Sequence, residues 1–155
     1  MLSFDNYKKI KILCAEDSLV YRSLYTKTFS DIFNCFDIAK DGQEAWQKYQ
    51  NKEYDLLLVD IIMPHFNGME LIQKIKEQNN NNITIILIMN SDDINCLLEV
   101  IRLDVDGFIF KPFEIEDLKE ELEGDDPPVQ SQIEFANADP SEPVVTEDEG
   151  NTSPE

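Results

Sequence analysis

The sequence predicts an α/β fold, a doubly wound five-stranded parallel sheet with helices on both faces. Two observations predict it. Between residues 10 and 123, short apolar runs alternate five times with segments whose apolar residues recur at helical spacing. The apolar run that precedes Asp60 also lacks polar alternation, as expected for a strand that helices cover on both sides.

The first strand is predicted at residues 10–15, which form a short apolar run. Ser18 follows it and can cap a helix, because a serine side chain accepts a hydrogen bond from a free N–H group of the first helical turn. The predicted inward face of that helix consists of Tyr21, Leu24, Tyr25 and Thr28.

The second strand is predicted at residues 35–39, and Asp41-Gly42 makes the turn into a second helix. The third strand ends at Asp60, and Gly68 precedes a third helix. The apolar positions of these two helices are Ala45, Trp46 and Tyr49 in the first, and Leu71, Ile72 and Ile75 in the second.

A polar loop at residues 79–82 leads into an isoleucine-rich fourth strand at residues 83–89. A fourth helix is predicted at residues 94–103 and a fifth strand at residues 107–110, and a fifth helix follows. The predicted inward positions are Leu97, Leu98 and Ile101 in the fourth helix, and Ile115, Leu118 and Leu122 in the fifth.

Composition excludes several classes of function. The chain has 155 residues, room for one ordinary domain, and 42% of them are apolar. Asp and Glu number 32 against 13 Lys and Arg, and the formal charge of −19 argues against direct nucleic-acid binding. No early apolar stretch is long enough to span a bilayer and residues 1–11 lack the apolar centre of a signal peptide, so we expect a cytoplasmic protein without membrane insertion.

The cysteines do not form a metal-ligand pattern. They are scattered, at Cys14, Cys35 and Cys96, and each falls inside a predicted strand or helix. We therefore interpret them as reduced, buried thiols.

Residues 124–155 differ in composition from residues 9–123, which we predict to be the folded domain. The tail contains nine acidic residues, five prolines and no Lys or Arg, and is predicted to be disordered. A solubilising tail or linker is the simplest interpretation. A docking or autoinhibitory segment at residues 129–135, anchored by Ile133 and Phe135, and truncation of a longer chain both stay open.

Charged residues follow three of the predicted strands. Glu16 and Asp17 follow the first, Asp60 ends the third, and Lys111 follows the fifth. Because the carboxyl ends of parallel strands meet at one edge, where such sheets bind ligands, these groups are expected to converge. Three carboxylates repel one another unless a cation offsets their charge, and oxygen ligands favour Mg²⁺. A metal beside a lysine suits phosphoryl transfer, with Asp60 as the nucleophile that forms an aspartyl phosphate.

Each of these residues also has an ordinary structural explanation. Glu16 and Asp17 could favour the start of a helix, Asp60 could cap a turn, and Lys111 could be a solvated lysine. Their placement at the ends of three different strands favours a site instead. His65, the only histidine, is interpreted as a solvated loop residue.

Several motifs are spread over the whole domain: Glu16-Asp17-Ser18, residues 39–45, residues 54–60, Met63-Pro64, Gly68, Gly107-Phe108 and Lys111-Pro112-Phe113. On these motifs the chain resembles the receiver domain of two-component response regulators, in particular single-domain, CheY-like receivers. The resemblance implies a flavodoxin-like sheet with the strand order 2-1-3-4-5. It also implies that the chain is no enzyme beyond its own phosphorylation and dephosphorylation.

The resemblance implies a role for each matching residue. Asp60 would accept the phosphoryl group, and Lys111 would contact it. The implied Mg²⁺ ligands are Asp17, Asp60, Glu16 through a water, and the backbone carbonyl of Ile62. The bond between Lys111 and Pro112 would be cis, which aims the lysine.

The resemblance also implies partners. A histidine kinase or a histidine phosphotransfer protein would supply the phosphoryl group. A downstream protein would bind the face formed by the fourth helix, the fifth strand and the fifth helix, since residues after Leu122 contain no output motif. Phosphate relay and a homodimer through that face stay open.

One position departs from the family pattern. Receivers carry Thr or Ser at the end of the fourth strand, where this chain has Met89, which cannot donate a hydrogen bond. In the family that hydroxyl binds the phosphoryl group and an aromatic residue, here Phe108, follows its movement. Asn90 or Ser91 could substitute; otherwise the switch is weakened or altered.

Other classes of protein compete with this prediction. A pseudo-receiver, an interaction module with weak or no phosphorylation switching, is made conceivable by Met89. A haloacid dehalogenase phosphatase needs a second aspartate at the position of Ile62, and a flavodoxin-like nucleotide binder needs a phosphate loop where Glu16-Asp17 stands. The intact acidic cluster and Lys111 favour the phosphorylated receiver, because a costly charge cluster has no use without chemistry.

Overall fold

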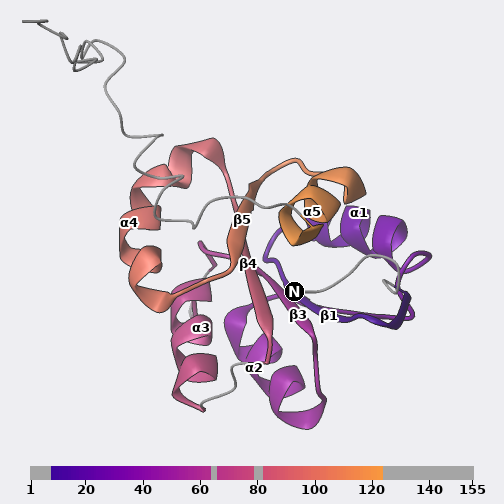
Figure 1. The fold of residues 1–155 in the computed structure, drawn as a ribbon, viewed down its shortest axis with the longest axis horizontal. Helices are drawn as coiled ribbons and strands as arrows, with labels where there is room; N and C mark the ends of the chain where they lie inside the picture. The colour runs from indigo at the N-terminus through magenta and orange to yellow at the C-terminus, as the bar shows by residue number, and fades with distance from the viewer. Residues whose placement is uncertain (1–7, 64–65, 79–81, 124–155) are drawn as a thin grey trace, which may run out of the picture.

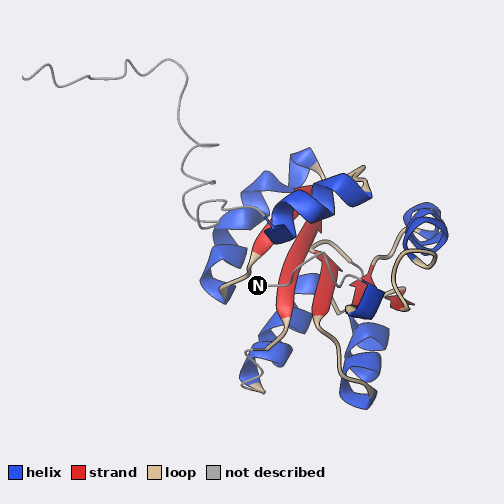
Figure 2. Ribbon diagram, turned by 45° about the vertical axis from the view of Figure 1, so that its right-hand side comes forward, coloured by secondary structure: helices blue, strands red, loops and turns tan. Residues whose placement is uncertain are grey.

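Five parallel strands form the centre of the molecule in the order β2-β1-β3-β4-β5, which confirms the predicted fold class. The structure is a computed structural model, and it describes residues 8–63, 66–78 and 82–123. Figure 1 and Figure 2 show the twisted sheet between two groups of helices. The strands are β1 (Lys11–Ala15), β2 (Cys35–Ala39), β3 (Leu56–Asp60), β4 (Thr84–Met89) and β5 (Gly107–Phe110).

Helices cover both faces of the sheet. α1 and α5 pack on one face and α2 and α3 on the other, with α4 beside α3 (Figure 1). In the described residues the helices are α1 (Leu19–Phe29), α2 (Gly42–Asn51), α3 (Gly68–Glu77), α4 (Leu97–Val100) and α5 (Ile115–Glu123), and α4 lies between two 3₁₀ segments, η2 (Ser91–Cys96) and η3 (Ile101–Leu103).

Strand β3 shows why the sheet needs both layers of helices. Leu57 and Val59 point into the apolar cluster shared with α2 and α3, whereas Leu56 and Leu58 point into the cluster shared with α1 and α5. All four side chains are fully buried. Burying one such aliphatic side chain contributes roughly 2 kcal/mol, so each layer is held by its own set of strand residues.

The helix starts follow the capping residues in the sequence. The Ser18 side chain accepts a hydrogen bond from the N–H of Tyr21 at 3.4 Å, and the Asp41 side chain accepts one from the N–H of Glu44 at 2.8 Å. These bonds satisfy donors that the first helical turn leaves free. They place α1 and α2 immediately after β1 and β2.

The predicted inward face of α1 is wrong at one position. Tyr25 and Phe29 are buried, but Leu24 is 44% exposed. Tyr25 and Phe29 are four residues apart and share one side of the helix, while Leu24 is turned about 100° from Tyr25. The aromatic side chains therefore decide which stripe of α1 faces the sheet.

The predicted single helix at residues 94–103 is replaced by the three short segments η2, α4 and η3. The side chains of Leu97 and Ile101 are outside the described part, and Leu98 is 57% exposed rather than inward. Asp92, Asp93 and Asn95 favour local hydrogen bonds over a regular helix. Asp104, with φ of 55°, then ends the segment in the left-handed conformation.

The three cysteines are free, as expected, but only Cys14 is fully buried; Cys35 and Cys96 are half-buried. No helix of the described residues combines the length and apolar character needed to cross a bilayer. The predictions for His65 and for residues 124–155 concern positions outside the described part of the chain.

A polar cluster ties the edge strand β2 to the start of β3. The Tyr54 hydroxyl donates to Asp37 Oδ2 at 2.6 Å, and Lys52 Nζ lies 2.9 Å from the same oxygen. Burial acts to raise the pKa of Asp37, but the hydrogen bonds from Tyr54 and Lys52 outweigh it and hold the pKa below its usual value.

Tyr54→Phe is expected to lower the free energy of unfolding by about 1 kcal/mol at pH 7, because Asp37 loses its buried donor. Because the folded-state pKa of Asp37 lies below the unfolded value of 3.8, ionised Asp37 stabilises the fold above pH 3.8. This stabilisation is lost as the pH falls through the lowered folded-state pKa. The difference between the variant and the parent should therefore shrink below pH 3.8 in urea unfolding. An equal difference at acidic and neutral pH would contradict this account, and Lys52→Met, which breaks an exposed ion pair, should have the smaller effect.

Candidate functional site

Four charged residues meet at the carboxyl edge of the sheet, as predicted. Glu16 and Asp17 follow β1, Asp60 ends β3 and Lys111 follows β5. Lys111 Nζ lies 2.6 Å from Asp60 Oδ2, and 3.0 Å and 2.8 Å from Glu16 Oε1 and Oε2. Strands β1 and β3 are neighbours, whereas β4 separates β3 from β5, so the long lysine side chain spans the end of β4.

The backbone fixes where Lys111 begins. Its N–H donates to the carbonyl of Met89, the last residue of β4, at 2.8 Å. The peptide bond between Lys111 and Pro112 is cis. The Lys111 side chain therefore begins at a backbone position that is hydrogen-bonded to the neighbouring strand β4.

The cluster is buried and short of positive charge. The side chains of Lys111 and Asp60 are each 4% exposed and that of Glu16 is fully buried. Two carboxylates therefore share one ammonium, which leaves an excess negative charge when both are ionised. Such a charge in a weakly polar environment is costly unless a proton or a second cation offsets it.

Burial dominates the proton affinities of the two buried carboxylates, but not that of the lysine. It raises the pKa of Glu16 to about 7, with the charge of Asp60 adding to the effect and the hydrogen bonds from Lys111 and the Ser18 N–H opposing it. Burial likewise raises the pKa of Asp60, against the opposing hydrogen bond and charge of Lys111. Burial acts to lower the pKa of Lys111, but hydrogen bonds to Asp60 and Glu16 outweigh it and the pKa is raised.

The acidic residues fit a hard divalent cation. Oxygens of Glu16, Asp17 and Asp60 lie within 4.8 Å of one another, and Asp17 is the exposed member. Glu16 Oε2 is buried and accepts no hydrogen bond from the described residues, since its 2.8 Å approach to Lys111 Nζ lacks hydrogen-bond geometry. A carboxylate oxygen with unused acceptor capacity beside two other carboxylates is the donor set that Mg²⁺ prefers.

Ile62 lies beside this cluster through its backbone. Its N–H donates to Asp60 Oδ1 at 3.1 Å, while its side chain is 51% exposed. The two oxygens of Asp60 therefore have different partners, the ammonium at Oδ2 and a neutral N–H at Oδ1.

Two residues of α1 support the site and were not assigned to it from the sequence. Arg22 Nη1 donates to the carbonyls of Glu16 and Asp17, at 3.1 Å and 2.7 Å, and so holds the loop that carries both acids. Lys111 Nζ lies 4.7 Å from the centre of the Tyr21 ring, a cation–π contact. The signal that could have found them is their position in the first helical turns after Ser18.

Of the predicted switch residues, Met89 and Phe108 lie in one apolar cluster, whereas Asn90 and Ser91 are exposed. Met89 is fully buried, and the half-buried Phe108 packs against the same apolar cluster. Asn90 and Ser91 are exposed; the N–H of Asn90 donates to Asp93 Oδ2 at 3.0 Å, a local bond that involves none of Glu16, Asp17 and Asp60. The end of β4 is therefore apolar at the position where the resemblance predicts a hydroxyl.

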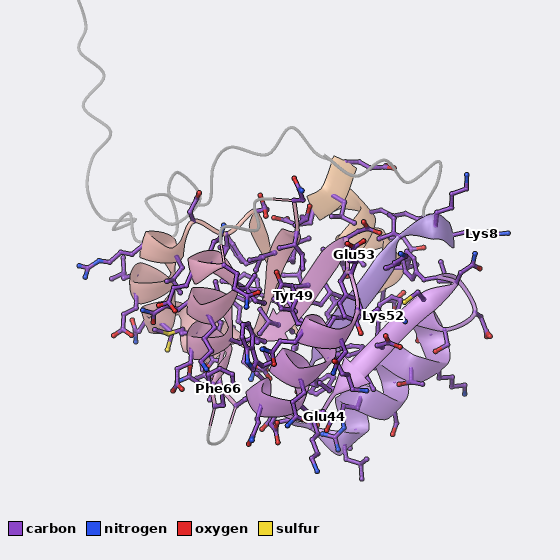
Figure 3. All side chains as sticks on the ribbon, turned by 90° about the horizontal axis from the view of Figure 1, so that it is seen from below. Lys8, Glu44, Tyr49, Lys52, Glu53 and Phe66 are labelled. Carbon is purple, nitrogen blue, oxygen red and sulfur yellow. The ribbon has the colours of Figure 1, made fainter. Side chains whose placement is uncertain are left out.

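A cavity of about 440 Å³ lies elsewhere and takes no part in this cluster. Its lining residues precede β3 and β4, so it opens at the amino edge of the sheet, opposite the carboxylates. Figure 3, seen from below, labels Tyr49, Lys52 and Glu53 of this region.

Comparison with known proteins decides the family. The family model for the response regulator receiver domain matches residues 12–123. The chain belongs to the response regulator receiver domain family. Receiver domains accept a phosphoryl group in two-component signalling, and they interact with histidine kinases or phosphotransfer proteins and with downstream partners. Nothing in the comparisons favours the pseudo-receiver, and the phosphatase and nucleotide-binder alternatives belong to other families.

Relatives include receivers of different overall length. Chemotaxis protein CheY1 of Helicobacter pylori is 32% identical over 117 residues, which cover 74% of this chain and 94% of CheY1. Protein RcaC of Microchaete diplosiphon is 30% identical over 105 residues, 68% of this chain but only 16% of RcaC. The structure of chemotaxis protein CheY4 of Vibrio cholerae superposes with a TM-score of 0.67 at 26% identity, over 74% of this chain and 97% of that protein.

Without a divalent cation, stability should fall as the pH rises from 4.5 to about 7. Because the folded-state pKa of Glu16 is raised, the folded chain binds more protons than the unfolded chain in this pH range. The contribution of Glu16 to the free energy of unfolding is therefore fully present below pH 4.5 and is lost as Glu16 ionises. Asp60 acts in the same direction.

The measurement is urea unfolding in a chelator at several pH values. Glu16→Gln should flatten the dependence, because the amide cannot ionise, whereas Glu70→Gln, an exposed residue of α3, should leave it unchanged. An identical slope in Glu16→Gln and the parent would refute the assignment to Glu16.

Proposed function

We propose that residues 9–123 form a receiver unit in which Asp60 is the phosphorylated residue. The observation that carries this proposal is the 2.6 Å contact between Lys111 Nζ and Asp60 Oδ2 in a buried site. An ammonium at that distance from the acceptor oxygen is within reach of a phosphoryl oxygen that becomes attached there. It can neutralise the charge that develops during transfer.

The proposed step is transfer from a phosphohistidine. A carboxylate oxygen of Asp60 attacks phosphorus, a P–O bond forms as the P–N bond breaks, and the imidazole nitrogen departs with the electron pair. Lys111 remains the positive group beside the acceptor, and the Ile62 N–H orients the carboxylate through Oδ1. Burial of the cluster limits the access of water to the product.

Mg²⁺ is the proposed cofactor, because the acidic cluster fits it. Its proposed ligands are Asp17, Asp60, Glu16 through a water, and the backbone carbonyl of Ile62. Bound there, Mg²⁺ would supply charge neutralisation and orientation for the phosphoryl oxygens. Arg22 would act indirectly by holding the loop that carries Glu16 and Asp17.

Exposed apolar residues beside the cluster are proposed to contact the phosphate donor. Leu19 and Val20, which begin α1, are 69% and 75% exposed, and Ile62 is 51% exposed. Leu19 and Val20 are within three residues of the proposed ligand Asp17, and the backbone carbonyl of Ile62 is itself a proposed ligand. A histidine kinase or phosphotransfer protein that brings its phosphohistidine to Asp60 would cover these side chains.

The proposed downstream face consists of α4, β5 and α5, and it would act through partner binding or phosphate relay. Residues 124–155 are proposed to be a separate acidic segment, and the location is proposed to be cytoplasmic. Met89 supports an altered switch, in which phosphorylation proceeds but moves β5 less than a hydroxyl-bearing receiver would allow. A homodimer through the same face remains a second arrangement to test.

Asp60→Asn should abolish phosphorylation by a small-molecule donor such as acetyl phosphate with Mg²⁺, because the amide oxygen is a poor nucleophile. The fold should persist, since the substitution removes a buried charge without changing the side-chain shape. Intact-mass spectrometry reports the label, and Asp31→Asn, an exposed matched change, should keep it. Label that persists in Asp60→Asn would refute the assignment of the acceptor.

Met89→Thr should strengthen the structural response to phosphorylation, because it restores a hydroxyl donor at the end of β4. The measurement is an amide NMR titration of the chain with Mg²⁺ and then beryllofluoride, a phosphoryl mimic, with the response read at Phe108. In the parent, shifts should concentrate around Asp17, Asp60 and Lys111.

Met89→Val is the matched control, since valine has the shape of threonine without its hydroxyl. Both variants remove buried volume and should lose about 1–3 kcal/mol of stability. Equal responses of the two variants to beryllofluoride would show that the hydroxyl has no effect.

A further inference from the structure

A groove of about 380 Å³ lies between β5, the edge strand of the sheet, and α5. Phe108 and Phe110 are the aromatic residues among those that line it, and their ring centres are 5.5 Å apart in an edge-to-face arrangement. Phe108 packs against the apolar cluster shared with α2 and α3, and Phe110 is 41% exposed. Aromatic residues are enriched at protein interfaces, so an exposed Phe110 that lines a groove at the edge of the sheet favours a binding surface.

The rim of the groove is acidic. Asp117, Glu120 and Glu121 of α5 line it, and no Lys or Arg of the described residues is among its lining residues. Carboxylates beside aromatic rings form a surface that attracts cationic side chains, through charge pairing at the rim and through cation–π contact with the rings.

Glu121 also determines how a partner can bind. Its Oε1 accepts a hydrogen bond from the N–H of Phe108 at 3.2 Å. Gly107 permits this approach, because a Cβ atom there would collide with the Glu121 carboxylate. The carboxylate therefore occupies the outer side of β5, so a partner's main chain cannot pair with the strand there and contacts must come from side chains.

Charge disfavours two other classes of occupant, the chain's own tail and a second copy of the chain. Residues 124–155 carry nine acidic residues and no Lys or Arg, so the chain's own tail would meet like charge at the rim. A second copy would bring the same acidic rim and a net charge of −19. A segment of another protein with apolar and basic side chains complements both the rings and the rim.

We infer that the groove between β5 and α5 binds an apolar segment bearing Lys or Arg from a downstream protein partner. This inference rests on the proposed function, since it gives the chemistry of the partner of the proposed output face. The groove is connected to the phosphorylation site through β5, because Pro112, the residue after Lys111, lines it. Basic apolar segments, rather than acidic ones, are the class of ligand that this receiver recognises.

The test uses the full 155-residue chain and two labelled synthetic peptides. One has Leu and Lys at helical spacing, and the other has Glu in place of every Lys. Fluorescence anisotropy should detect binding of the Lys peptide only, and amide NMR should place its shifts at Phe108, Phe110 and α5. Equal binding of the Glu peptide would overturn the inference.

Variants separate the groove from general attraction to an acidic protein. Phe110→Ala should weaken binding about tenfold and Glu120→Lys about fivefold. The matched controls, Leu24→Ala on α1 and Glu70→Lys on α3, change residues of the same exposed kind and should have little effect. Equal weakening by Glu120→Lys and Glu70→Lys, without an effect of Phe110→Ala, would overturn the inference.

Two further outcomes would also overturn it. Groove amides that shift as the chain self-associates would assign the groove to a second copy. Groove amides that shift in Phe135→Asp would assign it to the chain's own tail. Asp60→Asn and the parent chain together keep the two proposals apart. In Asp60→Asn, peptide binding that survives while label is lost supports both proposals. In the parent chain, label on Asp60 without peptide binding refutes the groove alone.

Discussion

Two buried carboxylates face one buried ammonium at the carboxyl edge of the sheet, and the rest of the site is arranged around that imbalance. Glu16, Asp60 and Lys111 lie at the ends of three strands, and each would be costly to bury alone. The hydrogen bonds of Arg22 to the loop after β1, and of Lys111 to the end of β4, hold the charges in place. The buried cluster therefore carries excess negative charge when both carboxylates are ionised, and a bound cation would offset that charge.

That arrangement links the site to the edge strand. Lys111 directly follows β5, and the buried Met89 ends β4, at the position where the resemblance to receivers predicts a hydroxyl. Any signal from Asp60 to Phe108 therefore has two routes in this chain, the lysine itself and the apolar packing at the end of β4. The first route is electrostatic and the second is steric. Threonine at position 89 would add a hydrogen-bond donor at the end of β4, whereas valine would give only the same shape, so the two variants should differ in effect.

The fold was predictable because apolar runs specify strands that are covered on both faces. Strands β2 and β5 have the predicted bounds, and the convergence of Glu16, Asp17, Asp60 and Lys111 followed from the rule that parallel strands end at one edge. Contacts that depend on side-chain reach were not predictable: Arg22 and Tyr21 touch the site from α1. Leu24 was misplaced because neighbouring aromatic residues set the rotation of α1, and the region of α4 because local Asp and Asn bonds break its helix.

The absence of a side chain at Gly107 has a consequence for the behaviour of the chain at high concentration. A single added methyl group would displace the Glu121 carboxylate and expose the Phe108 N–H on an edge strand with two aromatic residues. Unpaired, aromatic edges are the templates from which sheets of separate molecules join into aggregates. Gly107 thus protects the solubility of the chain, independently of its net charge.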